Sequence, residues 1–208
     1  MTVPAANLVP LPADVASEWG ALVEPLAVGY HAVALAGERL GDRVGVVGGG
    51  PIGIAVSIAA RRRGTADVVV VEPVQARRRI LESIGLIAVP PERTPSDLQT
   101  VFECVGLSAT VRGAIEATRP GGTVVCVGVA EPEVQMPMVH LVIEERRLLG
   151  SSAHTRLDFA AVAESLSLDD VDLGTLIEAR TDLAGAPAVF EAYASGATAA
   201  IKTLVIPA

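Results

Sequence analysis

The chain has 208 residues, a length that suits one good-sized domain with a short appendage. Half of the residues are apolar but only 3% are aromatic, so the core must be aliphatic, as in buried parallel strands. A net charge of −8 without a dominant basic stripe argues against nucleic acid as the main partner. Two cysteines, Cys104 and Cys126, are too few for a disulfide scaffold and predict free thiols in a cytoplasmic protein.

The sequence predicts no membrane segment. Residues 1–4 lack the charged and apolar regions of a secretory signal. Val44–Ala60 carries no charge, but the run Gly48–Pro51 interrupts it, whereas a spanning helix needs roughly 20 unbroken apolar residues.

Strands and helices are expected to alternate along most of the chain. The first helices are expected at Val15–Leu22 and Leu26–Ala36, separated at Pro25. Strands are expected at Val44–Val47, Asp67–Glu72, Leu86–Val89, Leu98–Cys104, Thr123–Val129, Arg147–Ser151 and Ile201–Ile206. Further helices are expected at Ile52–Arg63, Val74–Ile84, Ser108–Ala117, Phe159–Ser167 and Pro187–Ser195. This alternation predicts βαβ crossovers around a parallel sheet.

A glycine-rich turn joins the first of these strands to its helix. Residues 48–53 read Gly-Gly-Gly-Pro-Ile-Gly and match G-x-G-x-x-G. In this context Gly48 allows the tight turn, Gly50 lets the backbone approach a pyrophosphate, and Gly53 permits close packing of helix on strand. The helix start supplies free N–H groups for phosphate, and Pro51 costs nothing there because its N–H would be unpaired.

Glu72 ends the second strand, 19 positions after Gly53. An acid at about this distance accepts hydrogen bonds from the ribose hydroxyls of a dinucleotide. Its charge would repel a 2′-phosphate and so favours NAD over NADP, although Arg77 and Arg78 could pair with such a phosphate. The sequence therefore predicts an α/β fold, a Rossmann-type doubly wound parallel sheet with helices on both faces.

With these residues in place, the chain resembles the medium-chain dehydrogenase/reductase family, in its zinc-type alcohol and polyol dehydrogenase branch. Motifs that carry the resemblance run nearly from end to end of the chain. They are Leu11-Pro12, Glu24–Ala27, Val47–Gly53, Glu72 with Arg77, Glu103–Gly106, Arg119–Gly122, Gly150-Ser151 and Ile201–Leu204.

The resemblance implies further contacts with NAD. Cys104 and Val105 would line the adenosine side, and Gly128 with Val129 would lead toward the nicotinamide. Two further contacts are implied at the ends of this site. The backbone near Ser151 would reach the carboxamide, and Lys202 would approach the pyrophosphate.

The resemblance also implies a missing half. Family members carry a catalytic domain before the region that matches Pro12, and it supplies the zinc ligands and most of the substrate pocket. Residues 1–25 are therefore expected to be a remnant of the link from that domain, and residues 26–208 to be the Rossmann domain. Glu24 matches a position that can help to bind zinc, but a catalytic zinc needs three protein ligands, so no zinc is expected here.

Catalytic residues are not identified by this sequence, and His31, His154 and Glu24 are weak candidates. His31 is more simply explained as a packed, hydrogen-bonded histidine, and His154 is equally well explained as part of a solvated loop. A nucleophilic Cys104 would need an electropositive setting to lower its pKa. The arginine triplets 61–63 and 77–79 are expected on solvated helix surfaces.

The resemblance also implies a homodimer, because in the family an edge strand of this domain pairs with that of a second copy. The apolar segment near residues 123–138 is the expected edge, and such pairing removes an exposed apolar edge. Two functions stay open. One is an NAD-dependent oxidoreductase acting on an alcohol, polyol or carbonyl compound, with its catalytic domain in the rest of a longer protein or in a second chain. The other is a truncated relative that acts as a non-redox cyclase, isomerase or lyase, or that binds nucleotide without catalysis.

Overall fold

Six parallel strands form the main sheet, in the order β3-β2-β1-β4-β5-β6. The computed structural model describes residues 2–38, 40–168 and 171–207. The strands are β1 (Arg43–Val47), β2 (Asp67–Val71), β3 (Ile87–Val89), β4 (Leu98–Glu103), β5 (Thr118–Cys126) and β6 (Arg147–Gly150). This is the strand order of doubly wound dinucleotide-binding sheets, whose direction of winding reverses between β1 and β4. The predicted fold class is confirmed.

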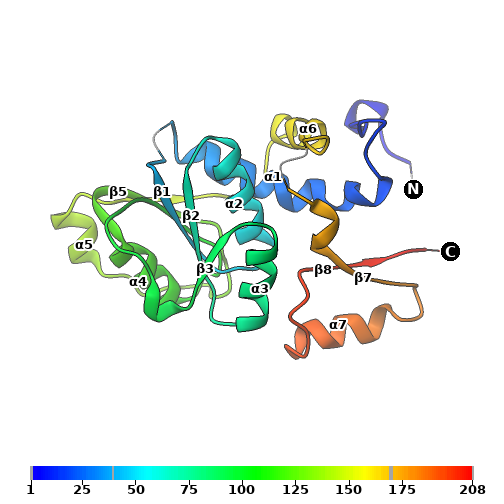
Figure 1. Ribbon diagram of the computed structural model, residues 1–208. Coiled ribbons are helices and arrows are strands. Elements are labelled where there is room, and N and C mark those ends of the chain that lie inside the picture. Colours follow the sequence, from blue (N-terminus) through cyan, green and yellow to red (C-terminus); the bar gives the residue numbers. More distant parts are fainter. Residues whose placement is uncertain (1, 39, 169–170, 208) are drawn as a thin grey trace.

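Helices cover both faces of this sheet (Figure 1). One face packs against residues of α1, α2, α3 and α6 in a single large core, and the other packs mainly against α4. The helices are α1 (Gly20–Leu35), α2 (Pro51–Arg62), α3 (Gln75–Ser83), α4 (Ser108–Ala117), α5 (Met138–Ile143), α6 (Arg156–Ser165) and α7 (Ala186–Ala194). The central strands are buried on both sides, which explains why β2 reads Asp-Val-Val-Val-Val without polar alternation.

Helix α1 runs without interruption through Pro25, so the predicted break there is wrong. A proline inside a helix costs about 3 kcal/mol through a lost hydrogen bond and a steric clash. On either side of it, Leu22, Val23 and Leu26 are at most 5% exposed. Each buried side chain of this size contributes about 1.5–3 kcal/mol, so their burial offsets the proline. The division proposed between residues 25 and 26 falls inside α1 and stays a prediction.

A second, two-stranded parallel sheet joins β7 (Ile177–Thr181) to β8 (Lys202–Val205), with α7 between them in sequence. The predicted last strand exists, but it does not join the main sheet. The sequence did not predict β7, because Ile-Glu-Ala-Arg-Thr is short and mostly exposed. In Figure 1 these elements and both chain termini lie at the end of the view opposite α5.

The edges of the main sheet are β3 and β6, and the predicted edge near residues 123–138 is wrong. Strand β5 lies between β4 and β6 and pairs with both. It begins at Thr118, five positions before the predicted start, because the Pro120–Gly122 segment that reads as a turn lies within the strand, beside a shift in register with β4. The short helix α5 was also not predicted.

The arginines of the first triplet reach neighbouring elements and are not merely solvated. Arg61 donates to the carbonyl oxygen of Gly85 at 3.3 Å, Arg62 to the Ser165 hydroxyl at 2.8 Å, and Arg63 to the carbonyl oxygen of Val33 at 3.1 Å. The end of α2 is thereby joined to α1, α6 and the turn after α3. Among the described residues, no helix is long and apolar enough to cross a membrane.

Helices α1 and α2 meet backbone to backbone at Gly29. A Cβ atom at this position would lie 2.4 Å from the carbonyl carbon of Ala55 and 2.5 Å from the amide nitrogen of Val56. Because main-chain atoms cannot turn away as a flexible side chain can, a larger residue must push the two helices apart.

We therefore expect Gly29→Ala to lower the free energy of unfolding by about 1–3 kcal/mol, as overpacking of a core does. The measurement is urea denaturation followed by circular dichroism. Gly113→Ala in α4 is the matched control, because no atom lies within 4 Å of its Cβ position. The control should be neutral or more stable by up to about 1 kcal/mol. Equal stability of the Gly29→Ala variant and the parent would contradict the proposed close contact.

Candidate dinucleotide site

The turn between β1 and α2 is closed by two glycines. Gly48 has φ of 101°, in the left-handed region that favours glycine. A Cβ on Gly53 would lie 1.8 Å from the carbonyl oxygen of Gly48, so only a hydrogen atom fits there. These two predicted roles agree with the geometry of the turn. Position 50 is less constrained, because nothing lies within 4 Å of a Cβ on Gly50, which leaves its outer side open.

The start of α2 presents amide groups that have no partner within the helix. The first N–H groups of a helix have no partner inside it, and Pro51 at the first position removes one of them. Ile52 and Gly53 follow in this first turn. Lys202 lies on the same small hollow as Pro51 and Ile54, although about 150 positions separate these segments in sequence. Free amide donors at a helix start make a suitable environment for a pyrophosphate.

An apolar cavity of about 480 Å³ opens beside this turn, at the carboxyl ends of β1 and β2. The start of α3 and the first turn of α4 form its other walls. Its size lies in the range of small-molecule sites. Of the predicted cofactor residues, Gly48, Glu72, Arg77 and Val105 line it, whereas Cys104 does not. Sequence reasoning missed the walls built by Leu107, Thr110, Pro91 and Thr94, which carry no motif.

Glu72 is buried, with 3% of its surface exposed. One carboxylate oxygen accepts the N–H of Gly49 at 2.9 Å, and the other accepts the N–H of Val74 at 2.8 Å. Both partners are backbone groups, and the salt bridges that the described residues form do not include Glu72. Since a carboxylate has about four acceptor sites, two remain for the hydroxyl groups of a ligand.

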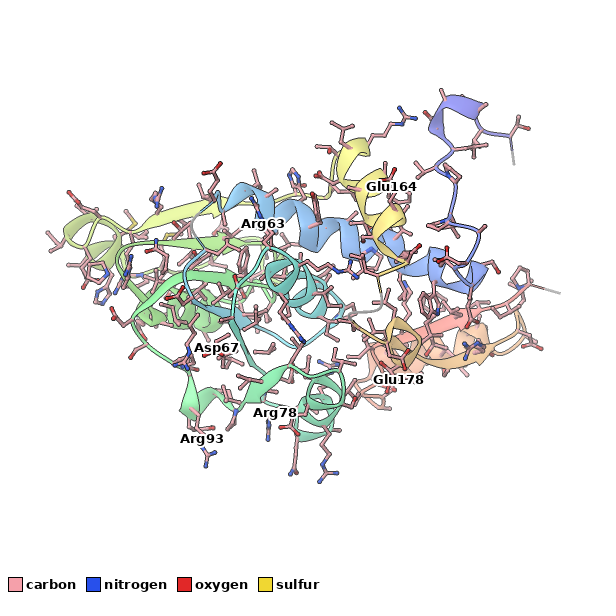
Figure 2. The ribbon with its side chains drawn as sticks, turned by 45° about the horizontal axis from the view of Figure 1, so that its top comes forward. Arg63, Asp67, Arg78, Arg93, Glu164 and Glu178 are labelled. Atoms are coloured by element: carbon pink, nitrogen blue, oxygen red, sulfur yellow. The ribbon has the colours of Figure 1, made fainter. Side chains whose placement is uncertain are left out.

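The two arginines after Glu72 have different roles. Arg78 donates to the carbonyl oxygens of Glu72 and Pro73, both at 2.7 Å, and so holds the turn that enters α3 (Figure 2). Arg77 lines the cavity, and its buried Nε has no hydrogen-bond partner among the described residues. Arg77 is therefore the arginine that is available to a bound ligand.

A second buried carboxylate, Glu103, lies at the end of β4, on the other side of β1. It is fully buried and accepts the N–H of Val105 at 2.9 Å and of Gly106 at 2.8 Å. This fixes the turn that faces the glycine turn: a Cβ on Gly48 would lie 2.6 Å from a methyl group of Val105. The sequence placed Glu103 in a motif but did not reveal this role. The signal that could have revealed it is an acidic residue at the end of a strand, two and three positions before the amides that it accepts.

The ends of β5 and β6 form the far side of the site. Gly128 packs closely against the turn at Val105 and Gly106, while Val129 is 89% exposed. Ser151 donates its N–H to the carbonyl oxygen of Cys126 at 2.9 Å, which extends the pairing of β6 with β5. Its buried hydroxyl has no hydrogen-bond partner among the described residues.

The two thiols lie in an environment that disfavours the thiolate. Burial, together with the nearby Glu103 carboxylate, raises the pKa of the Cys104 thiol above its ordinary range. The same two causes raise the pKa of Cys126 to about 11. Both cysteines are free. This setting is the opposite of the one that a nucleophilic cysteine needs.

The three catalytic candidates lie on α1 and near α6. The His31 Nδ1 is 2.9 Å from an Asp158 carboxylate oxygen, a contact that joins α1 to α6. His154 packs its ring against Phe159, with ring centroids 5.4 Å apart. Glu24 is exposed on α1. No contact between these three candidates is present among the described residues.

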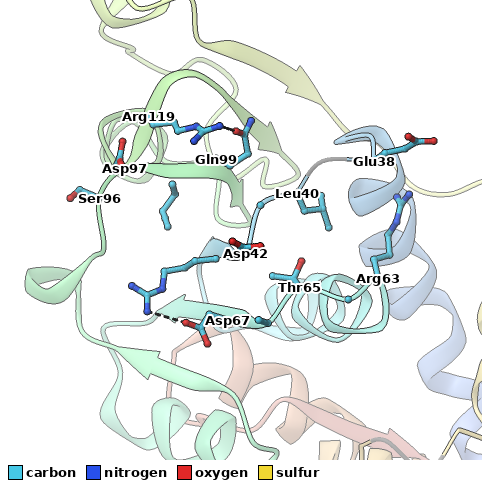
Figure 3. A pocket seen from close by; sticks show the side chains of 15 residues that line it. Glu38, Leu40, Asp42, Arg63, Thr65, Asp67, Ser96, Asp97, Gln99 and Arg119 are labelled. Atoms are coloured by element: carbon cyan, nitrogen blue, oxygen red, sulfur yellow. Dashed lines mark hydrogen bonds and ion pairs between the residues drawn. The ribbon is translucent and has the colours of Figure 1, made fainter.

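A larger hollow of about 860 Å³ lies at the opposite, amino-terminal edge of the sheet (Figure 3). Two pairs of its polar side chains are engaged with one another. Arg43 pairs with Asp67 at 3.0 Å and Arg119 donates to Gln99. Ligands of doubly wound sheets bind at the carboxyl ends of the strands, so this hollow is on the wrong side for a dinucleotide.

A family model for zinc-binding dehydrogenases matches residues 51–168, more than half of the chain. The chain belongs to the zinc-binding dehydrogenase family. The resemblance to medium-chain dehydrogenases, and to their alcohol and polyol branch, is thereby confirmed. The matched segment begins at Pro51, inside the glycine turn, and continues beyond α6.

The names of two similar proteins indicate a polyol and a sugar acid as their substrates. Sorbitol dehydrogenase of Macaca fascicularis is 32% identical over 206 residues, which cover 92% of this chain and 57% of the relative. L-idonate 5-dehydrogenase of Escherichia coli has a TM-score of 0.89 and 28% identity, over 99% of this chain and 62% of that structure. A zinc-binding dehydrogenase of Sinorhizobium meliloti bound to NADP has a TM-score of 0.83 and 28% identity, over 94% and 61%. The chain thus spans about three fifths of the proteins that it matches.

Zinc, which the family name implies, does not fit the residues of this chain alone. Among the described residues, no three His, Cys, Asp or Glu side chains gather closely enough to hold a metal ion. Catalytic zinc sites use three protein ligands. We therefore derive no chemical step through a metal from these residues.

The thiols provide a test of this environment. At pH 8 we expect alkylation of Cys104 and Cys126 by iodoacetamide to be slow in the folded protein, because a raised pKa keeps both thiols protonated. The rate at Cys126 should rise as the pH approaches 11, whereas both should react quickly at pH 8 once urea unfolds the chain and restores a pKa of about 8.5. Mass spectrometry of the labelled peptides is the measurement. Fast labelling of Cys104 in the folded protein at pH 8 would contradict the described burial.

Proposed function

We propose that this chain is the NAD-binding part of a dehydrogenase that acts on a polyol or a related alcohol or carbonyl compound. The observation that carries the proposal is the glycine turn, with Glu72 and an apolar cavity at its side. The family supports an oxidoreductase and a nicotinamide cofactor, and the named relatives support a polyol.

The bound cofactor would extend along the carboxyl edge of the sheet. The adenine would enter the apolar cavity, with its ribose hydroxyls on Glu72. The pyrophosphate would lie at the start of α2, near Lys202. The nicotinamide would lie toward Gly128, Val129 and Ser151, whose unpartnered hydroxyl is a further donor beside the backbone. When bound, the nicotinamide supplies hydride transfer, while the protein supplies orientation and electrostatics.

Preference for NAD over NADP would come from charge. The carboxylate of Glu72 would repel a 2′-phosphate, because like charges at close range are unfavourable. Arg77 opposes this effect, since its partly buried guanidinium lines the same cavity. The neighbour bound to NADP makes this balance a question for measurement.

The chemistry on the substrate would need groups from outside this chain. We propose that the catalytic domain belongs to the rest of a longer protein or to a second chain. Within this chain, His154 follows the end of β6 by a few residues, so it is the candidate that we place nearest to the substrate. His31 is already engaged with Asp158. Two free cysteines are consistent with a reducing, cytoplasmic environment.

Isothermal titration calorimetry with NAD, NADP and ADP tests the proposal. We expect all three to bind, and NAD to bind more tightly than NADP. Arg77→Ala should weaken NADP more than NAD, by about fivefold to tenfold, because a charge-assisted hydrogen bond is lost. Arg79→Ala, an exposed neighbour on α3, is the control and should change neither affinity. If neither NAD nor NADP binds, the proposed function is wrong.

We also propose that two copies pair through β6. This strand is one of the two edges of the main sheet, and α5 immediately before it is strongly apolar and exposed: Met138, Val139, Val142 and Ile143 are 58–76% exposed. Such an edge favours self-association.

Multi-angle light scattering should give the mass of a dimer, and Ile143→Asp should give a monomer because it buries a charge in the interface. Leu157→Asp on α6, at a position 82% exposed, is the control and should stay dimeric. A monomeric parent protein at micromolar concentration would exclude this interface.

A further inference from the structure

Glu72 contacts the glycine turn directly. Its carboxylate lies between the N–H of Gly49, at 2.9 Å, and the N–H of Val74, which precedes α3, at 2.8 Å. The stem of the same side chain packs against the turn, because a Cβ on Gly49 would lie 3.1 Å from both Cβ and Cγ of Glu72. One buried side chain therefore joins the turn after β1 to the turn after β2.

These contacts satisfy groups that would otherwise be costly. A buried amide or carboxylate without a partner loses its hydration and gains nothing in return. Both partners of Glu72 are backbone N–H groups. Each needs an acceptor oxygen, so both contacts persist only while both carboxylate oxygens are present. The neighbouring backbone contact, from the Gly48 N–H to the carbonyl oxygen of Val71 at 2.9 Å, anchors the turn at one point only.

We propose that Glu72 is a positioning residue for the pyrophosphate as well as an acceptor for the ribose, an inference that rests on the proposed NAD site. By fixing Gly49, it fixes the backbone that leads to Gly50 and to the free amides at the start of α2. Loss of its carboxylate would weaken the binding of every ligand that places a diphosphate at this turn. Replacing the acid would then not simply convert the preference from NAD to NADP, since both cofactors depend on the turn.

The test separates the two roles with a ligand that lacks ribose hydroxyls. The parent protein and Glu72→Gln are titrated with ADP and with 2′,3′-dideoxy-ADP. Glutamine has nearly the same shape but one acceptor oxygen, so it can bind only one of the two amides. We expect the variant to bind dideoxy-ADP about tenfold more weakly than the parent does. Affinity for dideoxy-ADP that stays within about twofold of the parent value would overturn the proposal and leave a ribose role alone.

Amide hydrogen exchange provides a second measurement that needs no ligand. In Glu72→Gln the N–H of Gly49 or of Val74 should exchange faster than in the parent, while the amides of β5 stay protected. Unchanged exchange at both positions would overturn the proposal. The control is Glu82→Gln, an exposed carboxylate on α3, which should alter neither exchange nor affinity.

The two proposals fail in different ways. If the parent protein binds neither ADP nor NAD, the proposed function is wrong, and hydrogen exchange still decides whether Glu72 holds the turn. If the parent binds both nucleotides and the variant binds dideoxy-ADP equally well, the NAD site stands and the positioning role does not.

Discussion

The contact between Gly53 and the carbonyl oxygen of Gly48 constrains much of this molecule. Because the backbone of α2 touches the backbone of the turn, the distance between helix and strand does not depend on any flexible side chain. Helix α1 then meets α2 in the same manner at Gly29. The first turn of α2 is therefore positioned by main-chain contacts on two sides, while the Glu72 carboxylate holds Gly49 in the turn before it. The proposed pyrophosphate site would benefit from such rigidity, because amide donors act strongly only when their directions are fixed.

Two buried carboxylates complete this arrangement. Glu72 and Glu103 end the strands on either side of β1, and each accepts backbone amides from a turn at the carboxyl edge of the sheet. Turns at this edge leave amides unpaired, and a buried acid satisfies them without adding a bulky partner. The cost is negative charge close to the proposed anion site, which the positive end of the helix dipole at the start of α2 offsets.

The centre of the fold follows from local signals, whereas its periphery does not. The valine runs of β1 and β2, and the glycines that end them, predict strand and turn because buried parallel strands need little else. Helix α4 begins and ends at the predicted residues. The break expected at Pro25 failed, because burial of the whole face of α1 outweighs one lost hydrogen bond. Strand β7 has no apolar pattern of its own, and its existence depends on a partner strand more than twenty residues away.

The site shows the same division. Gly48, Gly53 and Glu72 could be located from spacing, since each role needs a particular residue type at a particular step. The walls of the cavity could not, because Leu107 and Thr94 are ordinary residues that matter only through where the chain brings them. The position of Glu103 was visible, but its amide partners depend on the shape of the turn that it creates.

The hollow shared by Pro51 and Lys202 has a consequence for how the chain must fold. Leu22 and Leu26 from α1, and Ile201 directly before β8, meet at this same point. The proposed phosphate end of the site is thus assembled from segments far apart in the sequence, and closing so long a loop carries an entropic cost that only later contacts repay. The Rossmann sheet can form from nearby strands first, while this corner must wait until the segment at Ile201 and Lys202 has been synthesised. Competence to bind ligand is therefore expected to be among the last properties that the folding chain acquires.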